Sequence, residues 1–564
     1  MIRDVQVSAS GNDCRGNKEG WGSATVSIMT IESIQYFNNR YRRYNRFGRN
    51  VTFNLAFRKP TMNAAPNRLF VGRCLVWIAL VYGLLPVIAV AAESPAKAPA
   101  KEESWSVIFL SGKRIGYVHS VIETVDRAGT PIVTTLTVID MTIARDGQPL
   151  ILKQTMTTEE TPTGDLLQFR QEMSNPPAAV KITQGQIDGQ RLTLMQEVNG
   201  KGKTSTLPWK TGVKSSVYQD RVLKEQPLKP GETRSFEFFN PELTKLDKVT
   251  LKGFGPEEVK LLNNTTRRLF KVTSTQALLP GIMTESFLDD ESETIKTSTN
   301  MLGSMMESFR VSKAEALATI EPGSFDLTMN TLVKVKPILK GHATKRVVYR
   351  VTIAGQNPAE ILPVGDTQSI KKIDDQTAEL TVVSIPIPRS AKIGQVASEF
   401  LESSQLLQRD DDLVKKHANQ AAGNATDPGE IARRMEIYVQ QKLDKKNFST
   451  AMASAAEVAR TMEGDCSEHA MLLAAMLRVK GIPSRVAVGY VYVERLFAFS
   501  GHMWTEANLN GQWIPLDGTL GLGETGACHI KLADTSLSDD DLAAIIVPLS
   551  TIVGKLKLDV ISSE

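Results

Sequence analysis

The fold is decided by GDCSEHAMLLAAMLRVKGIPSRVAVGYVYV (residues 464–493) and by SGHMWTEANLNGQWIPLDG (residues 500–518). The first stretch contains Cys466, and the second contains His502 and Asp517. A cysteine, a histidine and an aspartate in separate elements are the side-chain types that a thiol nucleophile, its base and an orienting group require. The question is whether local structure can bring them together.

The cysteine stands at a predicted helix start. Asp465 is a suitable N-cap, and Glu468 three residues later completes a capping-box pattern. An apolar run follows and stops before Gly481. Cys466 is then the first helical residue, where unpaired N–H groups and the helix dipole favour a thiolate. A cysteine here can also be a small buried side chain without a chemical role.

The histidine and the aspartate belong to a predicted hairpin. Asn510-Gly511 between two alternating aromatic runs is a strong signal for a two-residue turn. With that turn, Asp517 faces Trp504 and is the diagonal neighbour of His502 on the same sheet face, with roughly 7–8 Å between their backbones. An imidazole and a carboxylate can bridge that distance. The alternative without a functional role is an unrelated histidine and aspartate on a surface hairpin.

Together the two stretches resemble the core of the transglutaminase-like superfamily, whose fold is related to papain-like cysteine peptidases. The resemblance rests on Gly-Asp-Cys at a helix start, Gly-Ile-Pro-x-Arg entering a strand, His-x-Trp-x-Glu on a strand, and Trp-x-x-x-Asp on the next. It covers about residues 425–535. Matched position by position, it implies Cys466 as nucleophile, His502 as base and Asp517 as the residue that orients the histidine.

Other residues near these motifs receive lesser roles. Trp504 and Glu506 share the His502 face of the strand and are expected to wall the site. Asp465 caps the helix, and His469, three residues after the cysteine, is expected in the core or hydrogen-bonded behind the site. The Cys466 backbone N–H is one natural oxyanion donor, and the sequence places no second donor.

A targeting segment precedes the folded part. Arg68 and Arg73 form a basic region, residues 74–90 are apolar, and Ala89-Val90-Ala91 is a small-residue cleavage site. This pattern predicts a secretory signal peptide cleaved near Ala91, with translation starting at Met62, and export to the periplasm or medium. An uncleaved anchor formed by Cys74–Val90 is the alternative.

Removal of that segment changes the charge and cysteine content. Residues 1–61 carry a net charge of +6 and residues 62–92 one of +2, so 93–564 carry −4 of the chain's +4. Nothing in this part favours nucleic acid as a partner. Cys466 and Cys528 remain, and they could be free or paired. The six histidines are scattered and no phosphate loop appears, so no metal or other cofactor is predicted.

The predicted fold class is multidomain α+β. The β regions are expected to hold antiparallel hairpins, with turns at Asp146-Gly147, Asp188-Gly189 and Asn199-Gly200. The predicted divisions are a non-native extension at 1–61, the signal peptide at 62–92, a linker at 93–103, an antiparallel β-rich domain at 104–320, a small β-sandwich-like domain at 321–390, a transglutaminase-like domain at 391–535, and a C-terminal helix and strand at 536–564.

Two functions from different classes fit this sequence. The first is an exported cysteine-dependent acyl-transfer enzyme on peptide or protein amide bonds, either a peptidase or amidase or a cross-linking transglutaminase, acting through a thioester. The second is a non-catalytic envelope protein that binds a partner, for which the β-rich region offers a surface. A complete Cys–His–Asp set favours the first, because a binding protein has no chemical need for all three.

Overall fold

The computed structural model describes residues 101–564 except 177, 179, 199, 302, 320–324, 451 and 540–542. The predicted N-terminal extension, the signal peptide and linker residues 93–100 lie outside the described residues. The described residues belong to one unit, Glu93–Glu564. In this part of the chain, no helix has the length and apolar character needed to cross a membrane.

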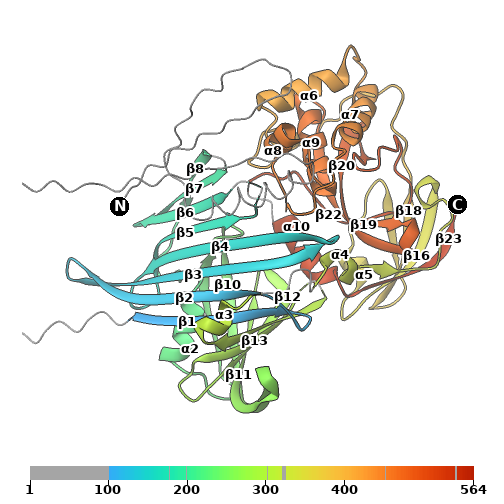
Figure 1. Ribbon diagram of the computed structural model, residues 1–564. Coiled ribbons are helices and arrows are strands. Elements are labelled where there is room, and N and C mark those ends of the chain that lie inside the picture. The colour runs from blue at the N-terminus through green and yellow to red at the C-terminus, as the bar shows by residue number, and fades with distance from the viewer. Residues whose placement is uncertain are drawn as a thin grey trace, which may run out of the picture. The chain divides into compact units, whose positions relative to one another are not determined.

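Fourteen strands form one antiparallel sheet (Figure 1). Two meanders meet in it, where β14 pairs with β1. Its order is β8-β7-β6-β5-β4-β3-β2-β1-β14-β13-β12-β11-β10-β9. The strands are β1 Lys101–Leu110, β2 Lys113–Arg127, β3 Thr130–Arg145, β4 Gln148–Glu160, β5 Leu166–Ser174, β6 Lys181–Asp188, β7 Arg191–Val198, β8 Lys201–Pro208, β9 Thr233–Asn240, β10 Lys245–Lys260, β11 Thr266–Gln276, β12 Leu279–Leu288, β13 Thr294–Met301 and β14 Ser304–Val311. Short helices accompany it: α2 Tyr218–Glu225, η2 Leu262–Asn264, α3 Lys313–Ala316 and α4 Leu327–Asn330.

The predicted hairpins are present in this sheet. Asp146 and Gly147 both have positive φ, +49° and +75°, as a two-residue turn between β3 and β4 requires. The strands on either side of the other two predicted turns, β6 with β7 and β7 with β8, also pair as hairpins. One boundary differs: β1 begins at Lys101, inside the predicted linker 93–103, because Lys101 to Glu103 pair with β2.

A second, five-stranded sheet carries the motif residues. Its order is β15-β20-β19-β22, and β21 pairs with β20. The strands are β15 Val333–Lys334, β19 Ser484–Val493, β20 Ala498–Leu509, β21 Gln512–Leu516 and β22 His529–Thr535, with η5 Glu494–Leu496 between β19 and β20. Helices α6 Asp412–Ala422, α7 Pro428–Lys442, α8 Ala455–Thr461 and α9 Cys466–Val479 gather beside these strands (Figure 1).

Helix α9 is the centre of this part of the fold. Every residue from Met471 to Leu477 is fully buried, which is typical of a helix surrounded by other elements. Its apolar side chains form one core with α6, α7, α8 and strands β19–β21. The helix that carries Cys466 is therefore held on several sides.

A four-stranded sheet packs against the five-stranded sheet and shares a second hydrophobic core with it. Its order is β17-β18-β16-β23, and its residues share a core with Tyr490, Phe499 and Ile530. The elements are β16 Arg346–Ile353, β17 Gln368–Lys372, β18 Thr377–Val383 and β23 Leu556–Ser563, with η3 Gly341–Ala343, α5 Pro358–Ile361, η4 Ser398–Phe400 and α10 Ala543–Ile552. The segment predicted as a separate small β domain at 321–390 thus takes an edge strand from the C-terminal segment.

Candidate active site

Cys466 is the first residue of α9, as its capping residues predict. Asp465 Oδ1 accepts a hydrogen bond from Ser467 N at 2.8 Å, and Glu468 Oε2 accepts one from Asp465 N at 3.0 Å, which completes the capping box. The thiol is free and half-buried. It therefore lies at the positive end of a rigid helix with part of its surface accessible.

The hairpin of β20 and β21 places His502 beside Asp517. Asn510 and Gly511 have φ of +54° and +81°, and Thr505 pairs with Leu516, which is the register that the two-residue turn predicts. His502 Nε2 lies 2.8 Å from Asp517 Oδ2. Both residues are buried, so this contact is shielded from water.

Asp517 has more partners than the hairpin alone supplies. Its Oδ2 also lies 2.9 Å from Nε2 of His529, at the start of β22. Its Oδ1 accepts the backbone N–H groups of Thr519 and Leu520 at 2.9 and 3.2 Å. Four hydrogen bonds hold a fully buried carboxylate in one orientation, with two histidines on the same oxygen.

The electrostatics of the site favour an ion pair between thiol and imidazole. Burial alone would raise the pKa of the Cys466 thiol, but the hydrogen bond and charge of His502, then the charge of Arg145 and the Met503 amide, bring it below the ordinary value. Burial opposes the charged form of His502, but Asp517 and then Cys466 raise its pKa to about 10. The pKa of Asp517 lies well below its usual range despite burial, because His502 and His529 stabilise the carboxylate.

His469 and Lys446 are two further ionisable residues near Cys466. His469 Nδ1 donates to the Asp465 carbonyl, and its Nε2 lies 3.2 Å from Lys446 Nζ. Burial and then the Lys446 charge lower the pKa of His469 to about 3, so its ring is neutral. Burial lowers the pKa of Lys446, which the charges of Cys466 and Asp517 oppose. Lys446 thus lies within electrostatic reach of the thiol.

The two residues predicted to wall the site differ in their surroundings. The Trp504 ring stacks near the His502 ring, with centroids 6.3 Å apart, and meets the His529 ring edge-on at 5.4 Å. Glu506 instead forms a buried ion cluster, 2.7 Å from Arg485 and 3.1 Å from Lys531. Trp504 therefore packs against the histidines, whereas the partners of Glu506 are the cations of neighbouring strands.

Four residues at the site carry no sequence signal that could have placed them: Arg145, Glu436, Lys446 and His529. His529 is a lone histidine outside the motifs, and Lys446 lies in a loop between two helices. Glu436 is fully buried on α7 and accepts the Asp517 backbone N–H at 3.1 Å. Burial raises the pKa of Glu436 to about 8.

One group among the described residues has the composition of a metal site. Ligand atoms of His502, Asp517 and His529 all lie within 4.8 Å of one another. These atoms already have hydrogen-bond partners, because both histidine Nε2 atoms contact Asp517 Oδ2. A cation there would compete with the hydrogen bond that orients His502.

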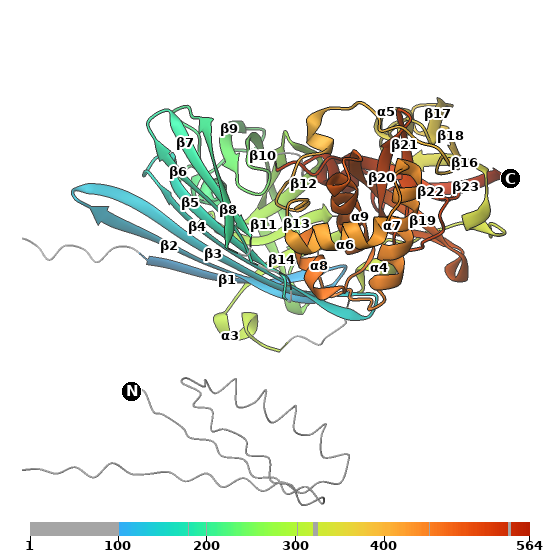
Figure 2. The same cartoon turned by 90° about the horizontal axis from the view of Figure 1, so that it is seen from above.

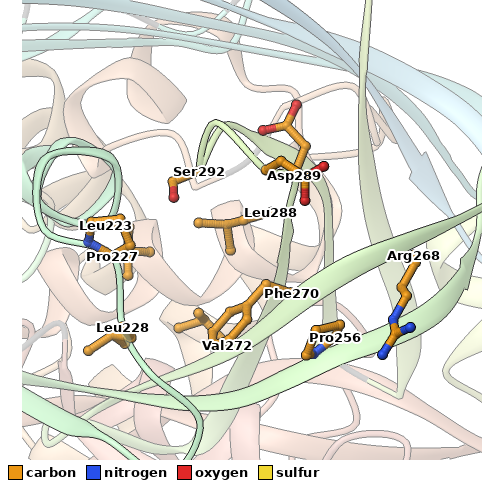
Figure 3. Close-up of a pocket in the computed structure, with 11 residues that line it drawn as sticks. Leu223, Pro227, Leu228, Pro256, Arg268, Phe270, Val272, Leu288, Asp289 and Ser292 are labelled. Carbon is orange, nitrogen blue, oxygen red and sulfur yellow. The ribbon is translucent and has the colours of Figure 1, made fainter.

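A cavity of about 430 Å³ lies apart from these residues, between α2 and strands β10, β11 and β12 (Figure 3). Apolar Leu223, Phe270 and Leu288 line it together with Arg268 and Asp289. None of the predicted site residues lines this cavity.

A helix-borne cysteine facing a histidine and an aspartate on a hairpin is the arrangement of the cysteine acyl-transfer folds. In the family comparison, residues 415–518 match the transglutaminase-like superfamily. This part of the chain is a transglutaminase-like domain. No curated protein matches the chain.

Three solved structures are similar to parts of the chain. A "putative cysteine protease" from Cytophaga hutchinsonii is 16% identical, with a TM-score of 0.26, over 38% of this chain and 87% of its own. A beta-barrel-like protein of a domain of unknown function from Brucella abortus is 13% identical, with a TM-score of 0.29, over 38% of this chain and 96% of its own. A "putative protease" from Parabacteroides distasonis is 13% identical, with a TM-score of 0.17, over 63% of this chain and 64% of its own.

Proposed function

We propose that this chain is a cysteine-dependent acyl-transfer enzyme that acts on amide bonds of peptides or proteins. The observation that carries the proposal is the position of Cys466 at the start of α9, where His502 lowers the pKa of its thiol and itself contacts buried Asp517. Helix dipole, imidazolium and carboxylate together favour the thiolate–imidazolium pair that attacks carbonyl carbon.

The reaction has two halves. The Cys466 thiolate attacks the amide carbonyl, a carbon–sulfur bond forms, and His502 gives its proton to the departing amine as the carbon–nitrogen bond breaks. Water or a primary amine then attacks the thioester, His502 takes the proton of that nucleophile, and the thiolate leaves. The Cys466 backbone N–H, at the helix start, is suited to stabilise the oxyanion of both tetrahedral intermediates.

The test follows Cys466 through this cycle. The purified full-length chain is treated with iodoacetamide across pH, and mass spectrometry identifies which cysteine is alkylated. Labelled protein substrates are then offered with and without a biotin-bearing primary amine, so that hydrolysis and amine incorporation are separated. Cys466→Ala should abolish both products while the protein remains folded.

Cys528 is the internal control for this experiment. It is fully buried beside Tyr349 and Thr344, and burial raises the pKa of its thiol. We expect Cys466 to be alkylated much faster than Cys528 at pH 6–7. Equal alkylation rates at the two cysteines under native conditions would show that Cys466 is not an activated nucleophile. The partner-binding function would then replace the proposed enzymatic function.

Export is the second part of the proposal, and it rests on the residues of the predicted signal peptide. N-terminal sequencing of the protein recovered outside the cytoplasm should begin at Ala92 or Glu93. A mature protein that still contains Trp77 would contradict cleavage. In that compartment the substrates would be envelope or extracellular polypeptides.

A further inference from the structure

The β3–β4 hairpin of the fourteen-stranded sheet contacts the loop that precedes α8 and α9. Gln148 Oε1 accepts the backbone N–H of Phe448 at 3.0 Å, and Arg145 Nη1 donates to the carbonyl of Thr450 at 3.1 Å. Figure 2 shows the ends of these two strands beside α4, which contacts β3. The tip of a hairpin some 300 residues earlier in the sequence thus lies next to the candidate active site.

Arg145 reaches beyond this loop to the residue before the nucleophile. Its Nη2 forms an ion pair with Asp465 Oδ2, and the side chains are 19% and 1% exposed. Asp465 uses its other oxygen to cap α9 at Ser467. Without Arg145, this buried carboxylate would keep an uncompensated charge beside Cys466, which is costly for folding and unfavourable for a neighbouring thiolate.

We propose that Arg145 is a positioning residue of the active site, through which the fourteen-stranded sheet fixes the N-cap of α9 and stabilises the thiolate form of Cys466. The inference deepens the proposed function and rests on it. Two effects combine in this role: the guanidinium neutralises Asp465, and it adds positive charge near the sulfur. The lowered pKa of the Cys466 thiol, to which the Arg145 charge contributes after His502, agrees with the geometry.

The consequence is that the transglutaminase-like domain is not a self-sufficient catalytic unit. A cation supplied by a different sheet couples the hairpin's position to the reactivity of the cysteine. Sequence gives no hint of this coupling, because Arg145 belongs to no motif and lies at the end of an ordinary hairpin strand.

The experiment measures the rate of iodoacetamide labelling at Cys466 as a function of pH in the full-length chain. Arg145→Gln should raise the midpoint of the profile by about 0.5–1 pH unit and slow labelling at pH 6 by about threefold to tenfold. Arg145→Lys keeps a charge and should give a smaller change. Arg127→Gln is the matched control, since Arg127 pairs with Glu159 elsewhere on the same sheet, and its profile should equal that of the wild type.

A second pair of variants keeps the test decisive if Arg145→Gln does not fold. Asp465→Asn retains an N-cap side chain but removes the carboxylate, so Arg145 becomes an uncompensated cation and the midpoint should fall. Adding Arg145→Gln to Asp465→Asn should raise it again. Equal midpoints for these two variants, or a wild-type profile for Arg145→Gln, would overturn the proposal. The proposed function fails separately, if wild-type Cys466 is alkylated no faster than Cys528.

Discussion

His502 Nε2 lies 2.8 Å from Asp517 Oδ2, and the two residues come from the two arms of one hairpin closed by Asn510-Gly511. The contact is short because the turn sets the register and both side chains lie on one face. Burial of both residues strengthens the interaction, since water does not compete for the carboxylate. Four predictions build on this arrangement.

Asp517→Asn should lower kcat strongly, by as much as about 10⁴-fold, because the imidazole loses the charge that fixes its tautomer and stabilises its protonated form. The amide oxygen can still accept the Thr519 and Leu520 backbone N–H groups, so we expect a folded protein. Turnover and thermal unfolding are measured together. A loss of activity that merely parallels a loss of thermal stability would make Asp517 a structural residue only.

The pH dependence of turnover should be bell-shaped. Activity should rise as the Cys466 thiol ionises, with a midpoint below about 8.5, because its pKa is lowered. It should fall as His502 loses its proton, near pH 10. His502→Ala should abolish turnover, because the proton donor and acceptor is lost, and should move the labelling midpoint of Cys466 upward. An unchanged labelling profile in that variant would show that His502 does not interact with the thiol.

His529→Ala should weaken the orientation of Asp517 and reduce kcat by about tenfold, since a hydrogen bond to a charged group contributes roughly 1.5–3 kcal/mol. His529→Gln keeps an N–H donor and should recover part of the activity. The proton chemical shift of His502, titrated by NMR, provides a reading that simple destabilisation would not change. The control is His417→Ala, because His417 contacts Tyr438 in the helical region. Full activity of His529→Ala would show that the contact of His529 with Asp517 is not needed for catalysis.

Glu436 should make folding stability depend on pH. Its pKa is raised to about 8 in the folded protein against an ordinary value near 4.5, so the folded state binds the proton more tightly. The stability that this proton contributes is complete below pH 4.5 and decreases as pH rises through 8. Glu436→Gln should therefore flatten the decline of unfolding free energy between these pH values.

Chemical denaturation at several pH values measures this slope. The matched control is Glu430→Gln, because Glu430 is a partly exposed glutamate on the same helix, pairs with Arg433 and Arg434, and has a lowered pKa. It should leave the slope between pH 4.5 and 8 unchanged. A wild-type slope in the Glu436 variant would show that Glu436 is ionised in the folded state.

Capping and turn residues predict the two local structures on which the candidate site is built. A capping box starts α9 at Cys466 and Asn510-Gly511 closes the β20–β21 hairpin, and each is encoded by residues within a few positions. Turn geometry then fixes the pairing of every residue in the hairpin, so the approach of His502 to Asp517 follows from the sequence. The roles assigned to these residues remain predictions for the experiments above.

The residues that join them from distant parts of the chain are brought together by the packing of sheets and helices. Arg145 arrives from β3, His529 from the start of β22 and Glu436 from α7, and no local pattern distinguishes these residues from others of their type. The pairing of β14 with β1, and of β23 with β16, is likewise set across long stretches of chain. The physical reason is that caps and turns are satisfied by hydrogen bonds between near neighbours, whereas these contacts form only after the sheets and helices have packed and excluded water from the charges between them.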